Sequence, residues 1–210
     1  MTRRCSEGTR LLLGLTGLAV TGWAVEHDRI GPVEAQAFRA VNRLPDSLYR
    51  PAWLVMQGGN LLAVPATAAV AWRADRPQLA RRALAGGGLA WLLAKVVKRT
   101  YRRPRPAVLV DGVGVRGRAP TGLGYVSGHA AVSTALGLAA MPELSRPGRA
   151  LAGLALPTIW ASRLYVGAHL PLDVLGGIAL GVAVDAVVDG VTGCGERGAR
   201  AMRGGSSVRR

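Results

Sequence analysis

The stretch ASRLYVGAHLPLD, residues 161–173, lies between two apolar runs and decides how this chain is interpreted. The run before it, ALAGLALPTIW, and the run after it, VLGGIALGVAV, are typical of helices buried in a membrane. Arg163, His169 and Asp173 nevertheless lie close together between them. Charged side chains are costly at membrane depth, so they usually pair with each other and mark a functional site. The stretch therefore predicts a functional site at a membrane edge.

The composition fits a single-domain membrane protein. The chain has 210 residues, of which 50% are apolar, and its net charge is +15. A strongly basic chain can indicate a nucleic-acid partner, but no nucleic-acid-binding motif accompanies the charge, so none is expected. Cys5 and Cys194 lie far apart without metal-type spacing and are expected to be free thiols. The sequence predicts neither a metal nor a cofactor.

Six apolar segments alternate with polar ones, which predicts an all-α bundle of six transmembrane helices. They are residues 9–26, 51–72, 83–98, 128–142, 150–168 and 171–192. A spanning helix needs about 20 residues, so the first, third and fourth qualify only if their polar ends lie in the interface. We expect the first to be a retained signal-anchor helix. Residues 28–50 predict a short amphipathic helix on the outer surface, with Pro32 in its first turn and Val33, Ala37, Phe38 and Val41 at helical spacing.

The basic residues predict the orientation. With both termini inside, the arginines of the cytoplasmic pieces outnumber the basic residues outside once the cluster in residues 98–126 is set aside for the site. Arg outnumbers Lys 25 to 2, which indicates the coding bias of a GC-rich bacterium. We therefore expect cytoplasmic N- and C-termini in a bacterial plasma membrane and a functional site at the extracytoplasmic end. The predicted domain covers residues 1–195, with a motif-bearing core at about 50–192, and residues 196–210 form a basic, disordered cytoplasmic tail. Asp185 and Asp189 share one face at the cytoplasmic end of the last helix, where they meet water or Arg.

Three polar stretches fall on the outer side in this topology: KRTYRRPRP (98–106), VSGHA (126–130) and the stretch quoted first. Each alone is explained by interface anchoring or helix capping. Together they bring two of the chain's three histidines to the same mouth as Lys98, Arg105 and Arg163. Cations and helix N-terminal N–H groups bind phosphate, and two imidazoles can divide the roles of nucleophile and general acid. Asp173, four residues after His169, is placed to fix the tautomer of that ring.

These stretches resemble the three motifs of the type 2 phosphatidic acid phosphatase superfamily. K-x6-R-P is matched by KRTYRRPRP, and S-R-x5-H-x3-D is matched fully by SRLYVGAHLPLD. P-S-G-H is matched by VSGH, with Val126 in place of Pro. That Pro shapes the backbone rather than touching phosphate, so the chemistry is expected to survive. The matching functional residues are Lys98, Arg105, Ser127, Gly128, His129, Arg163, His169 and Asp173.

The resemblance implies metal-free catalysis through a phosphohistidine. His169 would attack phosphorus, with Asp173 orienting it, and His129 would protonate the leaving oxygen and then activate water. Lys98, Arg105, Ser127, Gly128 and Arg163 would bind the phosphate oxygens. Arg99, Arg102 and Arg103 would either steer an anionic headgroup or anchor the interface.

The expected function is hydrolysis of a membrane lipid phosphate or diphosphate of the polyprenyl diphosphate, phosphatidylglycerophosphate or phosphatidic acid class. Three alternatives remain open at this point. One is a lipid-linked phosphotransferase on the same scaffold. Another is a vanadate-binding haloperoxidase. The haloperoxidases that share these motifs are soluble enzymes, so six apolar segments fit this alternative less well. The third is a non-catalytic membrane lipid-binding protein, which would not need the pairing of His169 with Asp173. The expected partners are the lipid substrate and membrane lipid, and the sequence predicts no oligomeric state.

Overall fold

The computed structural model describes the backbone of residues 2–27 and 30–205, and side chains within 7–27 and 30–192. The described residues form helices joined by turns and loops, with no strand among them, as the all-α prediction requires. The α-helices are α1 (Thr2–His27), α2 (Pro32–Asn42), α3 (Tyr49–Met56), α4 (Ala63–Arg73), α5 (Pro77–Tyr101), α6 (Pro106–Leu109), α7 (Gly128–Ala140), α8 (Arg146–Tyr165) and α9 (Pro171–Gly205). Short 3-10 turns are η1 (Asp46–Leu48), η2 (Gln57–Gly59) and η3 (Met141–Glu143).

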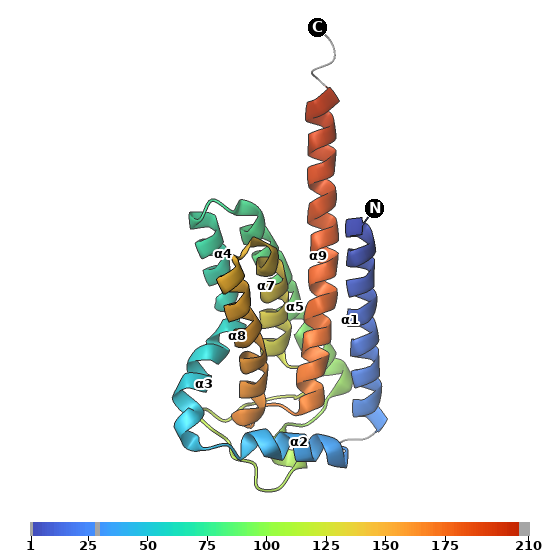
Figure 1. Ribbon diagram of the computed structural model, residues 1–210. Helices are drawn as coiled ribbons and strands as arrows, with labels where there is room; N and C mark the ends of the chain where they lie inside the picture. Colours follow the sequence, from blue (N-terminus) through green and yellow to red (C-terminus); the bar gives the residue numbers. More distant parts are fainter. Residues whose placement is uncertain (1, 28–29, 206–210) are drawn as a thin grey trace.

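The long helices run side by side, and α2 crosses one end of the bundle (Figure 1). Helix α1 packs along α9, and α7 lies against both α5 and α9. Helix α4 packs on α5, and α3 packs on α8. The start of α1 and the far end of α9 lie at the end opposite α2 (Figure 1). The end marked by α2 is called the motif end below, because the three motifs gather there.

Two described helices are long and apolar enough to cross a membrane by length and composition, Glu7–His27 and Pro171–Thr192. A third candidate is the pair Asp46–Gly59 and Ala63–Arg73, which is bent by 70°. The segment expected at residues 51–72 is therefore two helices with a bend between them rather than one straight helix, and its crossing of the membrane stays a prediction. Gly58 and Gly59 favour a break because glycine is unfavourable inside a helix, and the Asn60 side chain caps the N–H of Ala63 at 3.0 Å. The count of six spans stays a prediction.

The amphipathic helix expected within residues 28–50 is α2. Pro32 occupies its first turn, and Phe38 is 1% exposed. The expected apolar face is wrong at Val33, which is 77% exposed, and at Ala37, which is also exposed. The buried stripe instead runs through Glu34, Phe38 and Asn42, spaced four residues apart. A glutamate on the buried face of a surface helix needs a partner, and the site supplies it.

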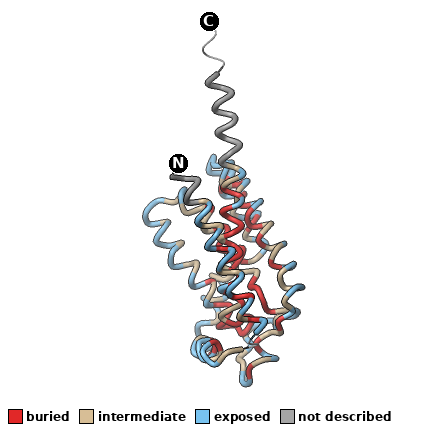
Figure 2. Tube along the Cα trace, turned by 90° about the vertical axis from the view of Figure 1, so that its right-hand side faces the viewer, coloured by how far each residue is buried: buried red, intermediate tan, exposed pale blue. Residues whose placement is uncertain are grey.

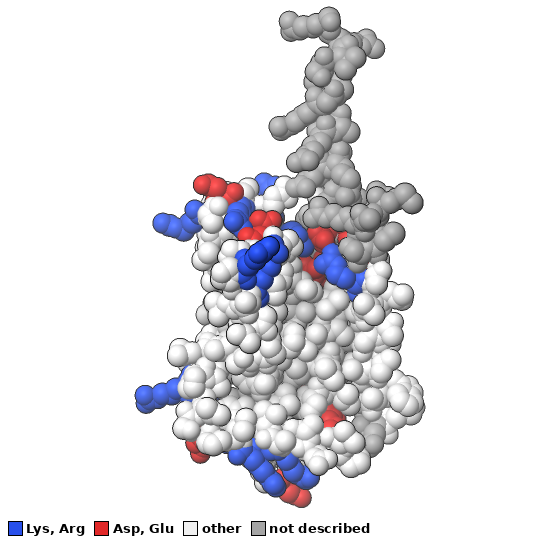
Figure 3. Space-filling view, viewed as in Figure 1, with Lys and Arg blue, Asp and Glu red and all other residues white. Residues whose placement is uncertain are grey.

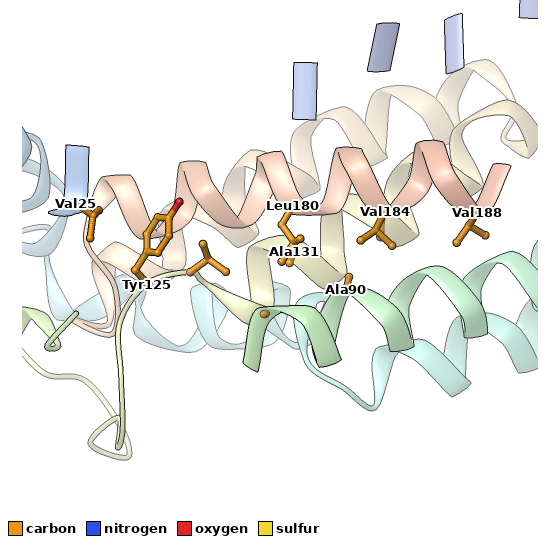
Figure 4. Packing of buried hydrophobic residues seen from close by; sticks show 10 residues of the cluster. Val25, Ala90, Tyr125, Ala131, Leu180, Val184 and Val188 are labelled. Carbon is orange, nitrogen blue, oxygen red and sulfur yellow. The ribbon is translucent and has the colours of Figure 1, made fainter. Parts of the chain in front are cut away.

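The core is built largely from small residues. Buried positions follow the inner sides of the helices (Figure 2), and α7 lies in the middle of the bundle. Figure 4 shows Ala131 of α7 beside Ala90 of α5 and Leu180 of α9. A Cβ at Gly177 would collide with the carbonyl oxygen of Ser127, so glycine there lets α9 approach α7 closely. A Cβ at Gly181, four residues on, would collide with the carbonyl oxygen of Ala131, so both glycines of α9 permit the close contact with α7.

Tyr125 ties the loop before α7 to α1. Its hydroxyl lies 2.8 Å from Thr21 Oγ1 and donates to the Leu18 carbonyl at 3.1 Å. Burial raises the pKa of Tyr125 to about 12, so the hydroxyl keeps its proton and can donate. The loop that carries the second motif is therefore held at its start.

The tail prediction falls at the edge of the described part. Side chains from residue 193 onward and the backbone of 206–210 lie outside it, so the tail stays a prediction. The side chains of Cys5 and Cys194 lie outside it as well, and the free thiols also stay a prediction.

Candidate active site at the motif end

The three motifs converge where α5, α8 and α9 end or begin. Lys98 lies in the last turn of α5, Ser127 caps α7, and Arg163 lies in the last turn of α8. His169 lies in the turn between α8 and α9, where the charges of Lys98, Arg105 and Arg163 act on it, as does His129. The structure thus brings together the residues that the sequence predicted from separate stretches.

Asp173 is held at the start of α9 and faces His169. Its Oδ2 accepts the Leu170 N–H at 2.9 Å, as a carboxylate in the first turn of a helix does when it caps that helix. The same oxygen lies 3.4 Å from His169 Nδ1, longer than a typical N–H···O hydrogen bond. Asp173 is 0% exposed and His169 is 3% exposed. The predicted contact between the two residues is therefore present, and both side chains are buried.

The neighbours of His169 assign its tautomer. Arg105 Nη1 lies 3.0 Å from His169 Nε2, and a guanidinium can only donate. Nε2 must therefore be the accepting nitrogen, which leaves the proton on Nδ1, facing Asp173. Burial, followed by the nearby charges of Lys98 and Arg105, lowers the pKa of His169 well below its ordinary value. The ring is thus neutral at pH 7, with the lone pair of Nε2 directed toward the cations.

Lys98 and Ser127 are fixed by backbone groups. Lys98 Nζ donates to the carbonyls of Leu123 and Gly124 at 3.0 and 2.7 Å. The Ser127 N–H donates to the Asp173 carbonyl at 2.7 Å, and its hydroxyl accepts from the Ala130 N–H. The second motif is therefore joined to the third through backbone bonds. Gly128 and His129 follow as the first residues of α7, at its positive N-terminal end.

Arg163 is buried with much of its hydrogen-bonding capacity unused. It is 9% exposed, and within the described residues its Nε has no hydrogen-bond partner. Its Nη1 contacts the Met56 thioether sulfur at 3.0 Å, a weak acceptor. Buried donors are normally satisfied, so this guanidinium has capacity for an anionic ligand.

Sequence reasoning missed the pair Arg103 and Glu34. Arg103 is 2% exposed, which is incompatible with the interface or headgroup role considered for it. It donates to Glu34 at 2.6 and 3.0 Å and to Asp173 Oδ1 at 2.9 Å. Glu34 also accepts the Leu172 N–H at 2.9 Å. Helix α2 therefore supports the carboxylate that faces His169.

The spacing of Glu34 from Phe38 was a signal that Glu34 is buried, but the sequence did not identify the cation that pairs with it. Glu34 shares the buried face of α2 with Phe38, four residues on, and a buried glutamate demands a cation. Nothing in the spacing said which of the neighbouring arginines would supply it. Arg99 and Arg102 are exposed, as expected for residues at an interface.

The buried charges of the site do not balance. Among the described residues, three arginines, Arg103, Arg105 and Arg163, face two carboxylates, those of Glu34 and Asp173. Burial lowers the pKa of Lys98 to about 7, so this fourth basic group adds its full charge once an anion binds beside it. A cavity of about 460 Å³ opens beside Arg105 and Arg163. The described residues contain no group of three or more His, Cys, Asp or Glu able to hold a metal ion. The arrangement fits an anion with two negative charges, such as a phosphate monoester.

Comparisons with known proteins agree with this geometry. The model of the PAP2 superfamily matches residues 80–189. Decaprenylphosphoryl-5-phosphoribose phosphatase of Mycobacterium tuberculosis is 37% identical over 113 residues, covering 54% of this chain and 61% of that protein. The protein of the same name from Mycolicibacterium smegmatis is 36% identical over 93 residues, covering 44% of this chain and 49% of that one. The matches thus span less than two thirds of these relatives.

Two crystal structures share the fold. Aquifex aeolicus LpxE has a TM-score of 0.66 at 21% identity, covering 73% of this chain and 92% of its own. The first transmembrane PAP2 type phosphatidylglycerolphosphate phosphatase from Bacillus subtilis has a TM-score of 0.66 at 20% identity. That match covers 87% of this chain and 95% of its own.

Proposed function

Because the chain belongs to the PAP2 superfamily, we propose that it is a membrane lipid phosphatase that hydrolyses a lipid phosphate or diphosphate through a phosphohistidine. The observation that carries the proposal is the neutral, buried His169, whose Nε2 lone pair faces an excess of cations. A group with this environment is a ready nucleophile toward a bound phosphate.

The first step transfers the phosphoryl group to the enzyme. The phosphate takes the place of His169 Nε2 as a partner of Arg105, and Nε2 attacks phosphorus in line with the lipid oxygen. Burial and the nearby charge of Arg163 lower the pKa of His129, and the negative charge of the bound phosphate opposes this shift, so His129 takes up a proton when the substrate binds. The N–P bond forms as the P–O bond breaks, and His129 gives this proton to the leaving oxygen. Asp173 accepts the Nδ1–H and stabilises the positive charge that develops on the ring.

The second step releases phosphate. His129, now neutral, takes a proton from water, and the resulting hydroxide attacks phosphorus. The N–P bond breaks, His169 regains its neutral form, and inorganic phosphate leaves. In both steps Lys98, Arg105 and Arg163 stabilise the non-bridging oxygens, with the Ser127 hydroxyl and the Gly128 N–H as further donors. Positioned donors of this kind usually supply the largest part of the rate enhancement in phosphoryl transfer.

The proposed location is a bacterial plasma membrane, with both termini cytoplasmic and the motif end outside. On the face drawn in Figure 3, charged side chains gather mainly near the two ends of the molecule. A broad band of uncharged surface lies between them, which suits the hydrocarbon region of a bilayer (Figure 3). The excess of arginines near the termini supports a cytoplasmic location for that end.

The names of the relatives suggest the substrates to try first. Decaprenylphosphoryl-5-phosphoribose, phosphatidylglycerophosphate, polyprenyl diphosphate and phosphatidic acid form the panel. Phosphate release from each lipid is measured with detergent-purified protein, in parallel with and without EDTA, because the mechanism needs no metal. His169→Ala is compared with His27→Ala, which replaces an exposed histidine at the end of α1.

The expected result is release by the wild type and by His27→Ala, with loss in His169→Ala of on the order of 10³-fold or more. Most activity surviving in folded His169→Ala would overturn the nucleophile assignment. Transfer of phosphate to an added alcohol, without free phosphate, would indicate the phosphotransferase. Strong inhibition by EDTA that metal reverses would contradict the metal-free mechanism.

A further inference from the structure

The cavity beside Arg105 and Arg163 is larger than a phosphate needs. Its volume of about 460 Å³ is within the range of roughly 300–1,000 Å³ typical of small-molecule sites. Beyond the two motif arginines, it is lined by Tyr49 and Trp53 of α3 and by loop residues 116 and 118–121. No Asp or Glu contributes to the described lining. The cavity therefore has room, and positive charge, for part of a substrate beyond the reacting phosphate.

The two additional arginines of the lining are in different states. Arg116 donates to the carbonyls of Asn42 and Tyr165 at 2.7 Å and to Asp46 at 2.7 Å, so it is a structural anchor. Its guanidinium also lies 4.2 Å from the centre of the Tyr165 ring. Arg118 is exposed and makes no hydrogen bond or ion pair with any residue in the described part of the chain. Arg118 is thus the lining cation that stays available to a ligand.

The backbone around Arg118 is held in place. Gly117, between the two arginines, has φ +76°, and a Cβ there would collide with the Tyr49 hydroxyl. A side chain at that position would be strained and would also push the loop away from α3. The anchor at Arg116 and the close contact at Gly117 together fix the start of Arg118. The long side chain of Arg118 therefore starts from a fixed point at the edge of the cavity and is free to reach a ligand inside it.

An aromatic side chain lies in the same cavity. Trp53 follows Tyr49 by one helical turn on α3, so both rings share one face. Trp53 is 44% exposed. A half-exposed indole offers a flat apolar surface and a donor at its edge, which suits a polar ring such as a sugar.

We propose that this cavity is a headgroup subsite that binds a second anionic group of the substrate, separated from the reacting phosphate by a sugar-sized spacer. Arg118 pairs with the second anion, and Trp53 packs against the spacer. A phosphodiester that joins a sugar phosphate to a lipid has this chemistry. The inference rests on the proposed phosphatase function and narrows its substrate class.

Three lipids test the inference. A short-chain polyprenyl-phosphoryl-5-phosphoribose carries a phosphate monoester and a phosphodiester on either side of a pentose. A polyprenyl diphosphate has adjacent phosphates, and phosphatidic acid has a single one. The variants are Arg118→Gln and Trp53→Ala. The matched control is Arg39→Gln, an exposed arginine on α2 at the same end of the molecule.

We expect each subsite variant to lower kcat/KM for the ribose-containing lipid about tenfold, Arg118→Gln through the loss of a hydrogen bond to a charged group and Trp53→Ala through the loss of the apolar surface of the indole. The other two lipids should change less than twofold, and Arg39→Gln should match the wild type on all three. Equal losses on every lipid, no loss on the ribose-containing lipid, or the same loss in Arg39→Gln would overturn the subsite. A similar loss of kcat/KM on the polyprenyl diphosphate would overturn the claim that a sugar-sized spacer separates the two anionic groups. Wild-type protein that releases phosphate from none of them would reject the proposed function, and the subsite with it.

Discussion

The molecule buries two clusters of ion pairs, and they differ in charge balance. At the end opposite the motifs, Arg10 contacts Asp185 and Asp189 at 2.6 Å each. Arg82 contacts the same two carboxylates at 3.1 and 3.2 Å. Two arginines thus meet two aspartates, and all four carboxylate oxygens are paired. At the motif end three arginines and Lys98 face two carboxylates, so positive charge is left over.

The arginines of the two clusters show the same contrast. Arg82 Nε and Arg163 Nε both lack a hydrogen-bond partner among the described residues. Arg82, however, uses its two terminal nitrogens on carboxylates, whereas Arg163 contacts a thioether. A balanced buried cluster stabilises a helix contact, here between α1, α5 and α9. An unbalanced one is costly without a ligand, which is the reason to expect function at the motif end.

The sharpest test of the contrast replaces one aspartate of α9 in each cluster. Asp173→Asn removes the acceptor of the His169 Nδ1–H and favours the wrong tautomer, so kcat should fall on the order of 10³–10⁴-fold. Asp185→Asn is the matched control on the same helix, and its turnover per folded molecule should stay within about twofold of the wild type. Phosphate release, normalised to folded protein, measures both. Similar losses of kcat in the two variants would show that the clusters do not differ in function.

Asp185→Asn, which should keep its turnover, should instead lower the stability of the protein. Asp185→Asn leaves Arg10 and Arg82 short of one negative charge in a buried place, which should cost about 3–5 kcal/mol of unfolding free energy. The double variant Arg82→Met with Asp185→Leu removes one charge of each sign, so most of that stability should return. Unfolding in detergent, followed by circular dichroism, reports both. A double variant no more stable than Asp185→Asn would show that charge balance is not what this end requires.

Glu34 should give a smaller effect on turnover, because it acts through Arg103. Glu34→Gln turns a carboxylate oxygen into an amide that cannot accept from the guanidinium, which loosens the support of Asp173. We expect kcat to fall about 10–100-fold, as for other groups that orient a reacting residue, with KM changed less than kcat. Gln36→Ala, an exposed neighbour on α2, is the control. A rise in KM at constant kcat would instead place Glu34 in substrate binding.

The sequence predicted what local spacing determines. His169 and Asp173 are one helical turn apart, so their contact follows from the third motif once a helix begins at Pro171. The pairing of Arg103 with Glu34 joins residues 69 positions apart, and only the path of α2 across the motif end decides it. The bend after η2 was missed because apolar composition alone does not report a break at Gly58 and Gly59. The cavity was missed because it depends on how the loop carrying Arg118 lies against α3.

The pH dependence of stability should show the smallest effect and distinguishes the site by sign. The folded state holds the pKa of His169 well below 6.5, whereas the unfolded chain restores the ordinary value. Below about pH 6.5 the unfolded state therefore binds a proton that the folded state does not, and stability falls as the pH falls. His169→Asn lacks this titration, so its melting temperature should drop less than that of the wild type between pH 7.5 and about pH 5. Parallel curves for the wild type and His169→Asn would mean that folding does not lower the pKa of His169. That result would contradict a buried nucleophile among excess cations.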